Sequence, residues 1–276
     1  MKRFIFILSF YLLINRCYAI GIVKPTGGRA AAMGCTSVCE QSLWALQNNP
    51  AGLAMLQGWH AGLYYENLWL LRETAYKSGG LVRGIPHIGC FGLSVSQNGW
   101  SQYSENRIGI AYARDFGPYL QMGLQVDWLL LHFGEGYDDR NAIALDLGIQ
   151  SQITERLRLG ASLFNPLNNR LKTLNEDALP IVMRFGLAYQ FTDSFVGQLE
   201  LEKDSQYAGV HLCGGLEYLL FGQFSLRAGA QHNPNVICFG AGYMIRGLHV
   251  DVAAQLHQLL GASIQISLTY NTSHRP

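Results

Sequence analysis

Few residues in this chain have types and spacings that could carry chemistry. Cys35 and Cys39 stand four positions apart and could form a redox pair, or a metal site if a histidine joined them. No second closely spaced cysteine pair and no HExxH motif accompanies them, so small apolar filler is the favoured interpretation. The cysteines that follow residue 19 are odd in number and widely spread, unlike a disulfide framework. We therefore expect no metal and no other cofactor.

An enzymatic centre is not indicated either. The sequence contains no serine nucleophile elbow, no phosphate-binding loop and no metal-binding histidine pair. A hydrolase could carry its three catalytic groups on separate strands, as Ser162, His211 and Asp251, but nothing in the sequence brings these three together. The protein is therefore not expected to be an enzyme.

A third set of residues is charged and is predicted to face the interior of a barrel. Charges in a narrow, partly dry interior must pair or accept hydrogen bonds, because an isolated buried charge costs several kcal/mol. This requirement favours a structural ladder of charges over a track that guides a substrate, although the sequence leaves both open. The set is Asp127, Asp146, Arg158, Arg184, Glu200, Glu217, Arg227 and Asp251.

Strands must position these residues, because apolar and polar residues alternate from about residue 58 to the C-terminus. In the last segment, Ile264, Ile266 and Leu268 point to one face, and the polar residues between them point to the other. Turn signals divide this part of the chain into fourteen segments. They are 59–67, 70–81, 87–97, 106–114, 119–133, 140–152, 156–165, 180–191, 195–203, 208–220, 223–231, 236–245, 248–257 and 262–271.

The connections between these segments alternate in length. The longer polar ones are Gln97 to Glu105, Gly134 to Asp139, Asn165 to Leu179 and Lys203 to Tyr207. Tight turns lie between them, for example at Arg246 and Gly247. Alternation of long outer loops with short periplasmic turns is typical of an outer-membrane barrel with an even number of strands.

Composition points to the same class of protein. Charged residues make up 14% of the chain, against about 25% in ordinary soluble domains, and aromatic residues make up 12%. After Ile14 there is no apolar run of the roughly 18 residues that a membrane-spanning helix needs. The sequence therefore predicts an all-β, transmembrane, antiparallel up-and-down barrel of about fourteen strands, in contact with outer-membrane lipid. The net charge is +1 and no basic cluster is present, which argues against nucleic acid as a partner.

Aromatic residues near strand ends are typical of side chains that settle at the membrane interface. Trp128 is the exception, because it falls within a predicted strand. The full set is Trp59, Tyr64, Tyr65, Trp69, Trp100, Trp128, Tyr189, Tyr218 and Tyr270.

Residues 1–19 are predicted to be a secretory signal peptide, because a basic start, an apolar run and a short polar stretch ending at Ala19 follow one another. A lipoprotein would be acylated at Cys17, but Arg16 is too large and too charged for the position before such a cysteine. Residues 20–57 do not alternate and are rich in small residues, which suits short helices and turns in a plug inside the barrel formed by residues 58–276.

The plug segment carries the motifs of a known family. Gly28 to Gly34 (GRAAAMG), followed about twenty residues later by Asn49, Pro50, Ala51, Gly52 and Leu53, resembles the opening of the FadL-type outer-membrane proteins. The sequence is more closely similar to the PorV/PorQ branch, which is associated with type IX secretion. Leu216-Glu217-Tyr218 followed by Leu226-Arg227-Ala228-Gly229 carries this second similarity, together with Asp251 and the final strand from Gly261 to Tyr270. Cys35 and Cys39 depart from the family pattern, which has small residues there.

Two functions follow from the resemblance. The PorV/PorQ similarity implies a component of protein secretion or surface assembly, with secretion-machinery proteins as partners. The alternative is a FadL-like transporter of hydrophobic small molecules, in which the segment around Asn49 and Pro50 acts as a gate. The residues themselves favour the simpler interpretation, in which this segment only packs the plug against the wall. Both functions place the protein in the outer membrane of a Gram-negative bacterium.

Overall fold

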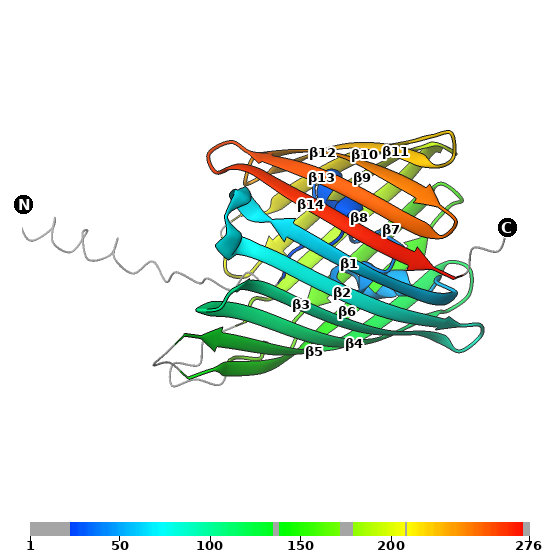
Figure 1. Ribbon diagram of the computed structural model, residues 1–276. Coiled ribbons are helices and arrows are strands. Elements are labelled where there is room, and N and C mark those ends of the chain that lie inside the picture. The colour runs from blue at the N-terminus through cyan, green and yellow to red at the C-terminus, as the bar shows by residue number, and fades with distance from the viewer. Residues whose placement is uncertain (1–22, 135–137, 172–178, 208, 273–276) are drawn as a thin grey trace, which may run out of the picture.

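The computed structural model describes residues 23–134, 138–171, 179–207 and 209–272. These residues form a barrel with a short stretch of chain inside its lumen (Figure 1). The predicted signal peptide, residues 1–19, lies outside the described residues.

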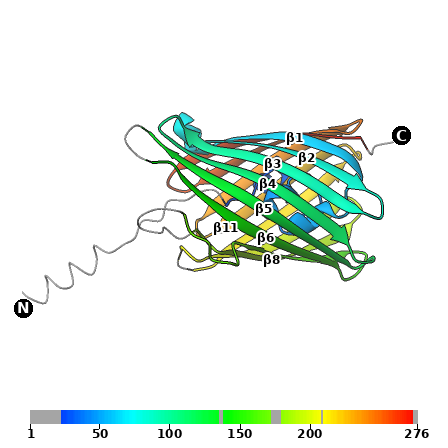
Figure 2. The ribbon, with the colours of Figure 1, turned by 90° about the horizontal axis from the view of Figure 1, so that it is seen from below.

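The barrel wall consists of fourteen strands within the described residues, each antiparallel to the next, and it closes where β1 pairs with β14 (Figures 1 and 2). The predicted antiparallel up-and-down barrel with about fourteen strands is therefore confirmed. The strands are β1 (Gly58–Asn67), β2 (Ala75–Ile85), β3 (Gly89–Trp100), β4 (Tyr103–Asp115), β5 (Leu120–Phe133), β6 (Arg140–Gln152), β7 (Leu157–Phe164), β8 (Val182–Thr192), β9 (Phe195–Asp204), β10 (His211–Leu220), β11 (Phe224–His232), β12 (Val236–Ile245), β13 (Leu248–His257) and β14 (Gly261–Asn271).

Each strand has an apolar outer face, and most inward positions are small or polar. On β4, for example, the outward Ile110 is 67% exposed and the inward Ala111 is 1% exposed. A closed ladder bonds every strand to two neighbours, which satisfies the backbone without water. The apolar outer surface is therefore the surface that meets lipid.

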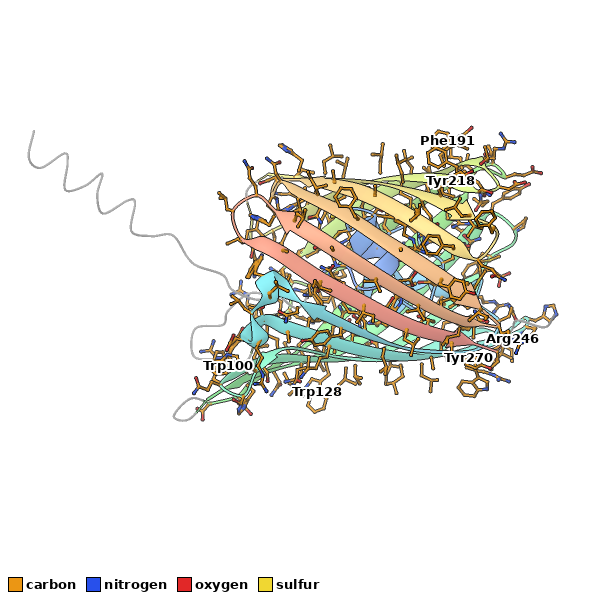
Figure 3. The ribbon with its side chains drawn as sticks, turned by 45° about the horizontal axis from the view of Figure 1, so that its top comes forward. Trp100, Trp128, Phe191, Tyr218, Arg246 and Tyr270 are labelled. Atoms are coloured by element: carbon orange, nitrogen blue, oxygen red, sulfur yellow. The ribbon has the colours of Figure 1, made fainter. Side chains whose placement is uncertain are left out.

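Aromatic side chains lie toward both ends of this outer surface (Figure 3). Trp100 lies toward one end, and Phe191, Tyr218 and Tyr270 lie toward the other. Tyr64 does not belong to this group, because it points inward and is buried against Trp44 of the N-terminal segment. Alternate residues of β1 point inward, and Tyr64 is one of them, so it does not lie at the membrane interface.

The two ends of the barrel differ. At the inner end, where β1 begins and β14 ends, the connections are short, such as Asp193 with Ser194 and Arg246 with Gly247. The outer end carries the longest connection, residues 165–181. Short turns face the periplasm in barrels of this kind, and longer loops face the outside.

Two predicted boundaries at the outer end are wrong. Gln97 to Glu105 is not a loop, because β3 and β4 continue as a ladder up to the pair Trp100 and Tyr103. The strand predicted at 70–81 begins only at Ala75, because residues 68–74 form two short 3₁₀ helices, η2 (Leu68–Leu70) and η3 (Arg72–Thr74). The Thr74 hydroxyl donates to the Leu68 carbonyl at 2.6 Å and holds that turn closed.

The N-terminal segment lies inside the lumen as α2 (Gly28–Ala32), α3 (Ala45–Asn48) and η1 (Pro50–Leu53), drawn in blue in Figure 1. Its first half contacts β11 to β14, and its second half contacts β3 to β6. None of the helices in the described part of the chain is long and apolar enough to cross a membrane.

Inward glycines allow this segment to touch the wall. A side chain at Gly229 would overlap the backbone of Met33 and Gly34, and one at Gly148 would overlap Asn49 and Pro50. The absence of a Cβ at these positions therefore decides where the segment seats.

We predict that Gly148→Ala loosens the N-terminal segment, because the added methyl group must displace Asn49 or the chain around Ala51. Overpacking of this kind costs about 1–3 kcal/mol. Unfolding of the purified barrel in denaturant and limited proteolysis of the segment would measure the effect. Gly79→Ala is the matched control, because its methyl group would meet only ordinary contacts, the nearest being Leu63 at 3.4 Å. Equal stability of the two variants would contradict the prediction.

Candidate functional site

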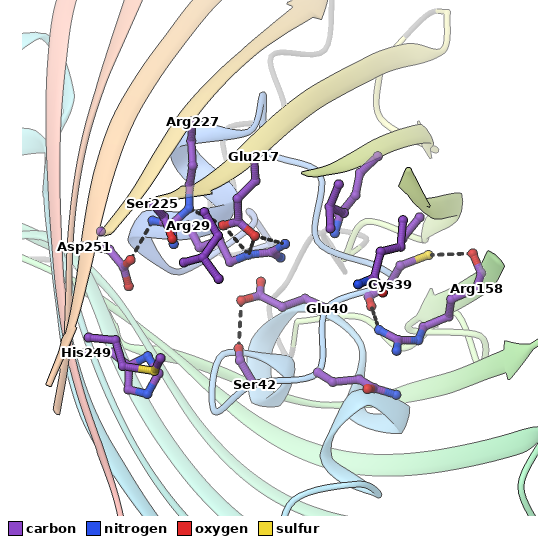
Figure 4. Close-up of a pocket in the computed structure, with 18 of the residues that line it drawn as sticks. Arg29, Cys39, Glu40, Ser42, Arg158, Glu217, Ser225, Arg227, His249 and Asp251 are labelled. Carbon is purple, nitrogen blue, oxygen red and sulfur yellow. Dashed lines mark hydrogen bonds and ion pairs between the residues drawn. The ribbon is translucent and has the colours of Figure 1, made fainter. Parts of the chain in front are cut away.

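A cavity of about 460 Å³ lies between the N-terminal segment and the wall from β6 to β13 (Figure 4). Glu155 and Arg156 from the β6–β7 turn and Gln223 from the β10–β11 turn line it, so it lies toward the inner end of the barrel. We call this cavity the vestibule. Its lining is rich in charged groups, which come from the strands, the N-terminal segment and the β6–β7 turn.

One charge network ties α2 to the wall of the vestibule. Arg29 donates to both carboxylate oxygens of Glu217, from Nε at 3.0 and 3.2 Å and from Nη2 at 3.0 Å. Arg227 donates to Glu217 and, at 2.6 Å, to Asp251. Burial alone would lower the pKa of Arg29, but the Glu217 carboxylate raises it overall, so Arg29 stays charged. The network thus binds the N-terminal segment to β10, β11 and β13.

Two further charged groups of the vestibule make no ion pair with a side chain of opposite charge in the described residues. Glu40 is 4% exposed; its Oε1 accepts from the Ser42 hydroxyl at 2.9 Å, and its Oε2 has no partner in the described part of the chain. Burial raises the pKa of Glu40, an effect that Arg29 opposes. Arg158 donates to the Gln152 side chain at 3.0 Å and to the Cys39 carbonyl at 3.2 Å.

A second group of charges lies further along the lumen. Arg107 binds Asp127 at 2.7 Å and reaches Asp146 at 3.5 Å. Gln125 donates to the other oxygen of Asp127 at 2.8 Å. All of these side chains are buried.

Arg184 forms the third group. Its Nε lies 2.6 Å from Glu202 and 3.8 Å from Glu200. Glu200 also accepts two backbone N–H groups of the N-terminal segment, from Ser37 at 2.6 Å and from Val38 at 2.8 Å. A wall carboxylate therefore caps the chain between α2 and α3.

All eight charges predicted to face the lumen do so, but they do not form one continuous ladder. Glu217, Arg227 and Asp251 meet in the vestibule, the other carboxylates meet around Arg107 and Arg184, and Arg158 stands apart. Arg107 and Glu202 also belong to these groups, and the prediction omitted them. The alternation could have found them, because Arg107 lies two positions from Gly109 on β4 and Glu202 lies two positions from Glu200 on β9. Arg29 had no such signal, because it lies in the segment that does not alternate. Whether any of these charges guides a substrate stays a prediction.

The predicted plug motif, Asn49 to Leu53, lies against β5 and β6 and is buried. Asn49 donates to the Val38 carbonyl at 2.6 Å and to the Ile149 carbonyl of β6 at 3.3 Å, and its Oδ1 accepts from the Ala51 N–H. Its amide therefore joins both halves of the segment to the wall. Movement of this motif stays a prediction.

The redox or metal chemistry that was weighed for Cys35 and Cys39, and not favoured, has no support in their surroundings. Burial raises the pKa of the Cys39 thiol to about 12 and that of Cys35 well above its usual range, so neither forms a thiolate readily. Within the described residues no group of three His, Cys, Asp or Glu side chains could hold a metal ion.

The three residues considered for hydrolysis are not assembled into a centre. His211 lies at the outer end of β10 against the Tyr207 ring. Asp251 lies in the vestibule and binds Arg227 and the Ser267 hydroxyl. Ser162 is on β7, and no hydrogen bond joins it to the other two.

An apolar cluster faces the lumen near the outer end, and sequence analysis did not identify it. It combines the inward positions nearest the outer end of β5, β6, β7 and β8 with residues of the connection 165–181. Val23 and Phe133 pack against it. The fully buried members of this outer apolar cluster are Leu129, Leu131, Ala142, Ala144, Phe164, Leu171, Leu179 and Val182. An inward run of leucines on β5, directly after Asp127, was the available signal.

No protein-family model matches the chain, and no curated protein resembles it significantly in sequence. Its architecture is that of the FadL-like barrels of the outer membrane of Gram-negative bacteria, and the apolar outer surface agrees with that location.

Three solved structures show this likeness. The Ralstonia pickettii toluene transporter TbuX is 15% identical with a TM-score of 0.67, over 91% of this chain and 100% of that one. A Pseudomonas aeruginosa FadL homologue is 14% identical with a TM-score of 0.67, over 91% of this chain and 100% of that one. The monoaromatic hydrocarbon channel CymD is 14% identical with a TM-score of 0.65, over 93% and 100%.

These neighbours correct the function predicted first. They are named as transporters or channels or as a FadL homologue, and none of the three is a PorV/PorQ protein or a secretion component. The prediction of a PorV/PorQ-type secretion role is therefore wrong. That prediction rested on the hairpin motifs around Glu217 and Arg227. In the structure these two residues belong to the charge network that anchors α2.

We predict that Glu217→Leu destabilises the protein and frees α2, because it leaves Arg29 and Arg227 without their shared carboxylate. Breaking one partner of a buried ion pair costs about 3–5 kcal/mol, and partial access of water to the vestibule favours the lower value. Denaturant unfolding and proteolysis after Arg29 would report the change. Glu155→Gln in the exposed β6–β7 turn should leave both unchanged, and a Glu217 variant as stable as wild type would contradict the prediction.

Proposed function

We propose that this protein transports small apolar molecules across the outer membrane. The observation that carries the proposal is the outer apolar cluster, a group of buried apolar side chains on the inner side of a barrel whose other inward positions are mostly small or polar. Apolar side chains on the inner wall are not needed to contact lipid, so they are suited to bind an apolar ligand.

The position of the cluster fits an entry site. It lies at the outer end, where a molecule arriving from outside first meets the lumen, and Val23 of the N-terminal segment packs against it. A hydrocarbon that enters there loses contact with water and gains contact with leucine, phenylalanine and valine side chains. Burial of apolar surface contributes about 25 cal/mol per Å², which is enough to hold a small aromatic ring weakly and reversibly.

The N-terminal segment separates this entry site from the vestibule. Its buried contacts with the wall, among them the bond from Asn49 to the Ile149 carbonyl of β6, close the direct route along the barrel axis. Transport therefore requires the segment to rearrange locally or the cargo to pass around it. The motif Asn49, Pro50, Ala51, Gly52 and Leu53 is our candidate for the part that moves.

The similar solved structures support the same class of cargo. TbuX is described as a toluene transporter and CymD as a monoaromatic hydrocarbon channel. The partners that we propose are an apolar small molecule and the lipid around the barrel.

We predict that Leu129→Gln lowers uptake of toluene about tenfold. An amide without a partner in an apolar site costs about 1–3 kcal/mol, and it would weaken the entry site by that amount. Radiolabelled toluene uptake would be measured in cells with an intact lipopolysaccharide layer that lack comparable channels. Leu124→Gln is the control, because Leu124 lies on the same strand but points to lipid. Unchanged uptake in a correctly folded Leu129 variant would contradict the proposal.

A further inference from the structure

We infer that the vestibule binds a small organic monocarboxylate, whose carboxylate group pairs with Arg158 and which arrives from the periplasmic side. Residues of the inner turns line this cavity, so such a molecule reaches it without passing the outer apolar cluster. The inference therefore goes beyond the proposed function and does not depend on it.

Arg158, near the start of β7, has unused hydrogen-bond donors in this cavity. A guanidinium group carries five N–H donors. Arg158 uses two of them on neutral acceptors, from Nε to the Gln152 side chain at 3.0 Å and from Nη1 to the Cys39 carbonyl at 3.2 Å (Figure 4). Its Nη2 group makes no hydrogen bond within the described part of the chain, and the partly buried side chain lines the vestibule. The free Nη1 and Nη2 donors suit the two oxygens of one carboxylate.

The vestibule supplies no acid for this guanidinium. The charge network that anchors α2 contains two arginines and two acids, so it is balanced within itself. Glu155 and Arg156 are neighbours in the β6–β7 turn, and both are exposed. Arg158 makes no ion pair among the residues that the structure describes, so its positive charge lacks a counterion.

Glu40 is the remaining acid of the lining, and it does not compensate Arg158. Its Oε1 accepts from the Ser42 hydroxyl, and its Oε2 has no hydrogen-bond partner in the described residues. Burial is the largest influence on this carboxyl group and raises its pKa, which works against a negative charge there. An anion that enters the vestibule therefore meets one uncompensated cation and little repulsion from Glu40.

The lining favours an organic monocarboxylate over an inorganic ion. One uncompensated positive charge matches one negative charge, whereas a dianion such as phosphate would leave a charge in excess. Val196, Leu219 and Met244 line the cavity beside its polar side chains, so an organic body gains apolar contacts there. The volume of about 460 Å³ lies within the range of roughly 300–1,000 Å³ that is typical of small-molecule sites.

Benzoate and benzamide test this inference, because they have nearly the same shape and differ in charge. Binding of each compound to the purified full chain would be measured by isothermal titration calorimetry in a non-ionic detergent at constant ionic strength. The heat measured with empty micelles would be subtracted. We expect benzoate to bind about tenfold more tightly than benzamide, because hydrogen bonds between two charged groups are stronger than those to a neutral amide.

Three variants assign the effect to Arg158. Arg158→Gln should lower the affinity for benzoate about tenfold, to the level of benzamide, and leave the affinity for benzamide unchanged. Arg158→Lys keeps the charge without the paired donors, so it should retain part of the preference, and it replaces Arg158→Gln if that variant fails to fold. Arg246→Gln removes the same charge from an exposed inner turn that does not line the vestibule, and it should leave both affinities unchanged.

Benzoate that binds the wild type no more tightly than benzamide would overturn the inference, and this comparison needs no variant. An affinity for benzoate that Arg158→Gln leaves unchanged, or that Arg246→Gln lowers equally, would also overturn it, because the charge of Arg158 would then not be responsible. None of these results bears on toluene uptake, so the proposed function stands or falls separately.

Discussion

The hydrogen bonding of the backbone in hydrocarbon is the constraint on which the rest of this structure depends. A strand edge cannot stay open where no water reaches it, so β1 must meet β14 and the sheet must close. Closure gives every strand one face toward lipid and one toward the lumen. The outer face is then fixed as apolar, and whatever distinguishes this protein from another barrel must lie on the inner face.

The inner face is divided along the barrel axis. Near the outer end it is apolar around Leu129, Phe164 and Val182, in the middle it carries buried acids held by Arg107 and Arg184, and near the inner end it forms a charged vestibule. A buried ion network of this kind contributes little net stability but is costly to break. It therefore fixes the position of the N-terminal segment beneath the apolar cluster.

Contact between the N-terminal segment and the wall depends on glycines in the wall, which have no side chain. Gly148 and Gly229 leave space for Asn49 and for the backbone at Gly34, and polar side chains such as Glu200 then accept the N–H groups that the irregular chain cannot bond internally. Apolar packing holds the second half of the segment, where Leu43, Trp44 and Leu46 join one buried cluster with Tyr64, Tyr76 and Val82 of the wall. The segment is therefore held in the lumen by polar contacts at some places and by an apolar core at others.

The barrel wall could be predicted from the amino-acid sequence, because an alternation of period two is a local property. It indicated the number of strands, the closure of the sheet and the inward direction of residues such as Asp146 and Arg227. The alternation did not predict the strand ends at Trp100 and Ala75. At Ala75 the reason is a side-chain hydrogen bond, from the Thr74 hydroxyl to the Leu68 carbonyl, that closes the turn before the strand. Which inward groups meet could not be predicted, because pairs such as Arg29 with Glu217 are 188 positions apart and depend on where the N-terminal segment lies in the lumen. For the same reason the outer apolar cluster, assembled from four strands and a distant connection, appeared only in three dimensions.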